Sequence, residues 1–68
     1  MPNSKVIGKR IKKLRESMNI SQEHLAKQLN VSPSTISMYE IGERIPRDET
    51  KIKIADMFGV SVSSIFFE

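Results

Sequence analysis

The stretch of residues 32–46, SPSTISMYEIGERIP, carries the side chains with the clearest capacity for intermolecular contact in this 68-residue chain. The hydroxyls of Ser34 and Ser37 can both donate and accept hydrogen bonds. Ile36 and Tyr39 are three residues apart and belong to the opposite, inward side of a helix. A solvent-facing helix surface usually carries Lys and Glu, whereas this one is nearly bare of charge. The pattern therefore indicates a surface that contacts another molecule.

Positive charge is concentrated near the start of the chain. The sequence has 11 Lys and Arg against 8 Asp and Glu, a formal net charge of +3. The cations that precede the first acid, Glu16, are Lys5, Lys9, Arg10, Lys12, Lys13 and Arg15. Such a basic block can meet an anionic partner, or it can be the solvated face of a helix. Composition leaves both interpretations open.

Catalytic and metal-binding chemistry finds few suitable residues. The chain has no Cys, which excludes a thiolate zinc site and a thiol nucleophile. Its single histidine, His24, stands beside Glu23 without the further groups that a triad or a metal site needs. We therefore expect no enzyme activity, no metal and no cofactor. No apolar run reaches the roughly 18 residues of a membrane span, and no signal-peptide pattern follows the N-terminal charges, so we expect a cytoplasmic protein without a membrane partner.

Apolar spacing and capping residues predict an all-α chain of five short helices in a single domain, residues 1–68. The expected helices lie at about residues 5–18, from the N-cap Ser21 to Asn30, at about 33–41, between a cap at Asp48 or a neighbour and Gly59, and from Ser61 onward. The last stretch, VSVSSIFF, is ambiguous with a strand, but Ser61 is a good cap and the apolar residues fit a helical period. The residues expected to face inward are Ile7, Ile11, Leu14, Met18, Leu25, Ala26, Leu29, Ile36, Tyr39, Ile52, Ala55, Met57, Phe58, Val62, Ile65 and Phe66.

The second and third predicted helices are joined only by Asn30, Val31 and Ser32. So short a connection favours a steep crossing, which is the geometry of a helix-turn-helix. Ala26 is the small residue that lets the two helices approach each other.

Five motifs in order carry a wider resemblance: LR, SQEHLA, VSPSTIS, then YE.GER.P, and finally IA..FGVSV..IF. With them the chain resembles the Cro and repressor type of helix-turn-helix transcription regulators, the Xre-like family with a lambda-repressor-like DNA-binding fold. The resemblance implies that the third helix lies in the major groove of double-stranded DNA and reads base edges. It implies a sequence-specific transcriptional regulator of the repressor kind, a homodimer on an inverted-repeat operator, in the nucleoid of a bacterial or phage system.

The resemblance also implies roles for individual residues. The expected base-reading residues are Pro33, Ser34, Ser37 and Met38. The expected DNA-backbone contacts are Gln22, Ser32, Lys9, Arg44 and Arg47. Arg15 and Glu40 match a buried salt bridge that ties the first helix to the third. Better-known family members often place Gln, Asn or Arg at the base-reading positions, so weak direct readout, supplemented by DNA shape and bridging water, is expected here.

An alternative function is an antitoxin or another small partner-binding protein of the same fold. Val62, Phe66 and Phe67 near the C-terminus are the residues on which this alternative depends. Apolar surface left exposed there can form a homodimer interface, or a site for a protein antagonist or toxin.

Overall fold

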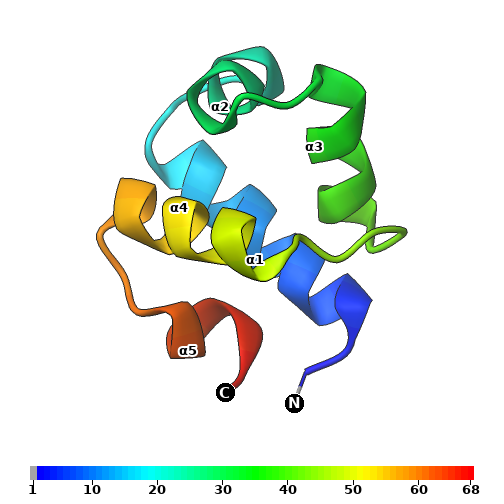
Figure 1. The fold of residues 1–68 in the computed structure, drawn as a ribbon, viewed down its shortest axis with the longest axis vertical. Helices are drawn as coiled ribbons and strands as arrows, with labels where there is room; N and C mark the ends of the chain where they lie inside the picture. The colour runs from blue at the N-terminus through cyan, green and yellow to red at the C-terminus, as the bar shows by residue number, and fades with distance from the viewer. Residues whose placement is uncertain (1) are drawn as a thin grey trace.

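Five α-helices joined by short turns make up residues 2–68, the part of the chain that the computed structural model describes. The helices are α1 (Ser4–Ser17), α2 (Gln22–Leu29), α3 (Pro33–Ile41), α4 (Asp48–Phe58) and α5 (Val62–Phe66). Figure 1 shows α2 and α3 together at one end of the molecule and α5 at the other. The predicted all-α fold is confirmed, and no helix within residues 2–68 is long and apolar enough to cross a bilayer.

Short polar side chains begin four of the helices by accepting a hydrogen bond from a backbone N–H three residues on. These N-caps are Asn3, Ser21, Ser32 and Ser61. Asn3 was not predicted as a cap, and it starts α1 one residue earlier than expected. The N-cap of α4 is Arg47, which makes no side-chain capping bond, and Asp48 is the first residue of the helix. The carboxylate of Asp48, in the first turn, still interacts favourably with the positive end of the helix dipole.

Residues in the left-handed conformation end the three middle helices. Asn30, with φ of 58°, ends α2 where the sequence predicted a stop. Gly42, with φ of 84°, and Gly59, with φ of 68°, end α3 and α4. Glycine adopts this conformation without the steric cost that a Cβ atom brings. Because Asn30 ends α2 and α3 begins at Pro33, the turn between these two helices has the predicted length.

One hydrophobic core joins all five helices. It consists of Ile7, Ile11, Leu25, Ala26, Leu29, Ile36, Tyr39, Ile54, Ala55, Ile65 and Phe66. The prediction was wrong for Met18, which lies beyond the end of α1 and is exposed. It was also wrong for Ile52, because the inward stripe of α4 is formed by Lys51, Ile54 and Ala55, and Ile52 is 59% exposed. A residue one position along a helix is turned by about 100°, which takes Ile52 out of that stripe.

The crossing of α1 and α3 depends on Gly8, a residue that sequence reasoning missed. Gly8 is buried, and a Cβ atom on it would stand 2.5 Å from the carbonyl oxygen of Tyr39. Only the missing side chain lets the two helices approach so closely. This contact fixes the position of α3 on the rest of the molecule.

Candidate nucleic-acid interface

The turn between α2 and α3 has the compact geometry that the sequence predicted. The N–H of Val31 donates to the carbonyl of Ala26 at 3.0 Å, which closes the end of α2. At the next residue, the Ser32 hydroxyl accepts from the N–H of Thr35 at 3.2 Å and begins α3. Ala26 is buried. The chain thus turns from one helix into the next within three residues.

The two sides of α3 differ as the sequence predicted. Ile36 is fully buried and Tyr39 is 6% exposed, so both belong to the core. Ser34 is exposed, and Ser37 and Met38 are half-buried on the other side. The outer face of α3 therefore presents hydroxyl and thioether groups and no charge.

The tip of α3 carries a cluster of hydroxyl groups. The Ser32 Oγ atom lies 3.0 Å from Ser34 Oγ and 2.9 Å from Thr35 Oγ1. Pro33 is exposed at the first helical position, where proline costs no hydrogen bond. Five residues implied as DNA contacts thus lie on α3 or at its tip: Ser32, Pro33, Ser34, Ser37 and Met38.

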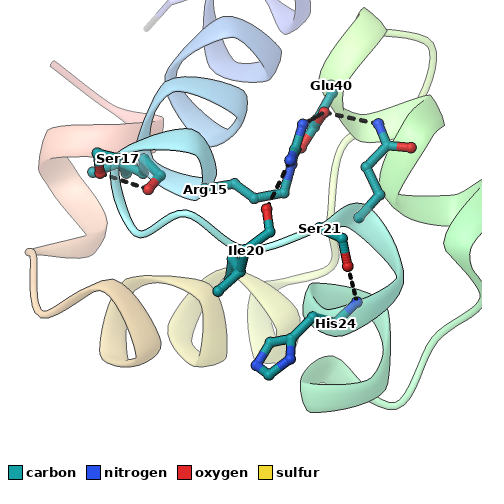
Figure 2. Close-up of polar contacts among 8 residues, drawn as sticks. Arg15, Ser17, Ile20, Ser21, His24 and Glu40 are labelled. Carbon is teal, nitrogen blue, oxygen red and sulfur yellow. Dashed lines mark hydrogen bonds and ion pairs between the residues drawn. The ribbon is translucent and has the colours of Figure 1, made fainter.

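Arg15 and Glu40 form the predicted ion pair between α1 and α3 (Figure 2). Arg15 Nε lies 2.6 Å from Glu40 Oε2, and Arg15 Nη2 donates to Glu40 Oε1 at 3.1 Å. The side chain of Glu40 is only 2% exposed, and that of Arg15 is 12% exposed. A third donor, Arg15 Nη1, bonds the carbonyl of Ile20 at 2.9 Å, so the same guanidinium holds the turn between α1 and α2.

The hydrogen bond to Glu40 raises the pKa of Arg15 above its ordinary value. A raised pKa in the folded state means that the stabilisation is complete below the ordinary arginine pKa and is lost only when pH rises through the folded-state value. Arg15 therefore stays charged throughout the neutral range.

Gln22, implied as a phosphate contact, is the first residue of α2 and is half-buried. Its amide Nε2 donates to Glu40 Oε1 at 2.9 Å. The Ser21 hydroxyl beside it accepts from the N–H of His24 at 3.0 Å, as Figure 2 shows. The sequence did not indicate that Gln22 contacts Glu40.

The cations separate into two groups in the structure. Arg10 and Arg15 bond to the protein itself, since Arg10 Nη1 donates to the carbonyls of Ser64 and Ile65 at 3.3 and 3.1 Å. The exposed lysines of α1 are Lys5, Lys9, Lys12 and Lys13. The basic block is therefore partly structural and partly solvated.

Arg44 and Arg47 are brought together beside α3. Both are exposed, and both line a hollow of about 520 Å³ with Thr35 and Tyr39. The N–H of Arg44 donates to the carbonyl of Met38 at 3.3 Å, which ties this loop to the end of α3. Lys9 does not line this hollow.

The C-terminal residues assigned to a dimer interface are not equivalent. Phe66 is fully buried and offers no surface to a partner, so its assignment was wrong. Phe67 is 50% exposed, and Val62 is half-buried. A hollow of about 290 Å³ is lined by Asp48, Lys51, Ile52, Val62 and Phe67.

Lys51, which sequence reasoning missed, is 8% exposed at this surface. Its ammonium lies 5.6 Å from the ring centroid of Phe66 and 5.3 Å from that of Phe67. Such cation–π contacts, with the carboxylate of Asp48 at 3.6 Å, compensate the partial burial of the charge. Their signal in the sequence is a cation within a helical apolar stripe, three residues before Ile54.

The profile of the helix-turn-helix family HTH_3 matches residues 11–65 of the chain. An uncharacterised HTH-type transcriptional regulator of Methanocaldococcus jannaschii is 42% identical over 84% of the chain and 86% of its own length. A second regulator of that organism is 62% identical over 54% of the chain, although the match spans only 15% of the relative.

The solved structures include the P22 c2 repressor in complex with a synthetic operator, which superposes with a TM-score of 0.87. That match covers 91% of this chain and 94% of the repressor chain at 27% identity. The lambda-repressor-like fold implied by the motifs is therefore confirmed. The chain belongs to the Xre-like helix-turn-helix family of transcriptional regulators.

Proposed function

We propose that this protein is a sequence-specific double-stranded DNA-binding regulator of the repressor kind, which reads the major groove with α3. The observation that carries the proposal is the uncharged outer face of α3, with exposed Ser34 and half-buried Met38, whose carbonyl accepts from the N–H of Arg44 in the following loop. An uncharged face of short side chains lets the helix approach base edges closely, and the thioether of Met38 can pack against a thymine methyl. The site contains no cofactor or metal in this proposal.

The cations would supply sequence-independent affinity. Arg44 and Arg47 beside α3, together with Lys9 on α1, are exposed and can neutralise phosphates. Gln22 and Ser32 can add uncharged hydrogen bonds to phosphate oxygens at two helix N-termini, where the helix dipole favours negative charge. Because serine at the base-reading positions gives fewer bidentate contacts than Arg, Gln or Asn, shape readout and bridging water carry much of the specificity.

We further propose that the protein acts as a homodimer on an inverted-repeat operator. The exposed apolar residues around the hollow between α4 and α5, Ile52 and Phe67, support a self-complementary interface there. Two copies of α3 would then enter successive major grooves about one helical turn apart. Such a regulator works in the cytoplasm, at the nucleoid of a bacterial or phage system.

The first experiment is selection of bound sequences from a random DNA pool at near-physiological salt. Enrichment of a palindrome with half-sites about one helical turn apart is the expected result. A pool that stays random, with a folded protein, would contradict base reading.

The second candidate function is binding of a protein partner, as in an antitoxin or a repressor with a protein antagonist. The specific observation that favours it is the same hollow between α4 and α5, because a partner could cover Ile52 and Phe67 in place of a second copy. A monomer in sedimentation that selects no DNA sequence would favour this candidate.

A further inference from the structure

Gln22 is held in one orientation by a buried carboxylate. Its Nε2 donates to Glu40 Oε1 at 2.9 Å, and the side chain of Glu40 is 2% exposed. An ionised carboxylate can only accept hydrogen bonds, so the amide nitrogen of Gln22 must face it and not the amide oxygen. One N–H of the amide and its carbonyl oxygen then remain for another molecule.

Glu40 is itself held in place by Arg15. Both of its oxygens accept from the Arg15 guanidinium, at 2.6 and 3.1 Å, and Arg15 also bonds the Ile20 carbonyl in the turn before α2. A glutamine side chain that is free in solution loses rotamer entropy when it is immobilised. In this protein much of that ordering precedes any contact with DNA.

The ion pair alone does not require Gln22. The guanidinium of Arg15 already neutralises Glu40 and contacts both of its oxygens, so the additional bond to Gln22 is not needed for charge balance. Its effect is to fix a flexible amide at the positive end of α2, where the Ser21 hydroxyl caps the N–H of His24. A hydrogen-bond acceptor placed at this end of α2 would meet both the oriented N–H of Gln22 and the partial positive charge of the helix N-terminus.

We propose that Glu40 is a positioning residue for DNA binding: it orients the Gln22 amide so that the remaining N–H meets a phosphate of the DNA backbone. This inference rests on the proposed function. It assigns to the Arg15–Glu40 pair a second role beyond stability, since the pair connects the packing of α1 against α3 to the position of a backbone contact on α2.

The electrostatic effect of Glu40 on DNA binding has the opposite sign to its positioning effect. Removing a carboxylate near DNA should strengthen binding to a polyanion through simple charge repulsion. Removing the group that orients Gln22 should weaken it. The exposed Glu43, in the loop after α3, is the matched control because its side chain is free to solvent.

The test is a double-mutant cycle on affinity for the selected duplex, with Gln22→Met, Glu40→Gln and the double variant, and with Gln28→Met and Glu43→Gln as controls. Gln28 is an exposed glutamine at the other end of α2. We expect Gln22→Met and Glu40→Gln each to weaken binding roughly three- to tenfold, the loss of one hydrogen bond. The loss from Glu40→Gln should fall to within about twofold in the Gln22→Met background, whereas Glu43→Gln should bind as tightly as the parent or more tightly.

Folding of each variant is checked by circular dichroism, and Glu40→Asp replaces Glu40→Gln if the latter unfolds. Aspartate keeps a negative charge beside Arg15 but is one methylene shorter, so its carboxylate draws back from both Arg15 and Gln22. A second readout needs no variant and no DNA: the side-chain amide protons of Gln22 in the parent should be shifted and slow to exchange with water, and those of Gln28 should not.

Three outcomes overturn the inference. They are equal losses from the Glu40 substitution in both Gln22 backgrounds, tighter binding by a folded Glu40→Gln or Glu40→Asp variant, and Gln22 amide protons that behave like those of Gln28. Failure of the proposed function looks different, because the folded parent protein would then select no sequence from the random DNA pool.

Discussion

Gly8 of α1 lies against the backbone of Glu40 at the end of α3, and a Cβ atom on Gly8 would stand 2.8 Å from the Glu40 carbonyl carbon. The obstacle is backbone, so it cannot move aside as a flexible side chain would. The same crossing brings Arg15, two turns further along α1, to the carboxylate of Glu40. The close approach of two backbones and the buried ion pair thus depend on each other.

The substitution Gly8→Ala tests this crossing, because helix propensity and steric overlap predict changes of opposite sign in the free energy of unfolding. Helix propensity alone predicts a gain of about 1 kcal/mol, because alanine is the better helix former. Overlap with the α3 backbone predicts a net loss of about 1–3 kcal/mol in the free energy of unfolding. Urea denaturation measures the sign, with Lys12→Ala on the exposed side of α1 as the control. A stabilised Gly8→Ala variant would show that the helices can separate without cost.

Removing one partner of the Arg15–Glu40 pair should destabilise the fold strongly. Replacing both partners with apolar residues should cost much less stability. Arg15→Ala leaves the buried Glu40 carboxylate uncompensated and should lower the free energy of unfolding by about 3–5 kcal/mol. The double variant Arg15→Met with Glu40→Leu removes both charges and should recover most of that loss. Thermal denaturation of the single and double variants measures the difference. A single variant as stable as the parent would contradict the burial of the pair.

Base reading by α3 predicts a change in preference and not only in affinity. Ser34→Ala with Met38→Ala should weaken binding to the selected sequence and relax the base preference, while binding to unrelated duplexes persists. Ser63→Ala, an exposed serine on α5, is the matched control. The measurement is a repeated selection from the random pool. Equal weakening on all sequences would assign these two residues to the DNA backbone.

Charged and uncharged backbone contacts should differ in their salt dependence. Lys9→Ala or Arg44→Ala should weaken binding to every sequence and reduce the slope of log affinity against log salt by about one. Gln22→Met should weaken binding without changing the slope, because an amide releases no counterion. Lys53→Ala, at an exposed position of α4, serves as the control for a lost surface charge. An unchanged slope removes the substituted cation from the phosphate contacts.

Dimerisation through the hollow between α4 and α5 predicts that Ile52→Ser and Phe67→Ser raise the dissociation constant of the dimer. Each is more than a third exposed in the monomer, so the loss of core packing is small compared with the loss of interface area. Sedimentation over a concentration series measures the effect, with Met18→Ser as an exposed apolar control. A monomer–dimer equilibrium unaffected by both substitutions would refute this interface.

The local structure could be read from the sequence because its causes are local. Ser21, Ser32 and Ser61 cap helices wherever an N–H three residues on needs an acceptor, and Asn30 ends α2 because its side chain tolerates the left-handed conformation. The outer face of α3 followed from a helical period once Ile36 and Tyr39 were placed inside. The Arg15–Glu40 pair followed from the family resemblance and not from the spacing.

The tertiary structure alone decided which candidate residues have surface to offer and which partners they meet. Phe66 and Phe67 are adjacent and alike in sequence, yet packing of α5 buries the first and leaves the second half-exposed. Gly8 looks like an ordinary helix interruption until α3 approaches it. Gln22 meets Glu40 because α2 packs against α3, which brings the start of one helix beside the end of the other. Period and capping determine what each helix can bury, whereas the angles and depths at which helices pack against one another determine what each residue touches.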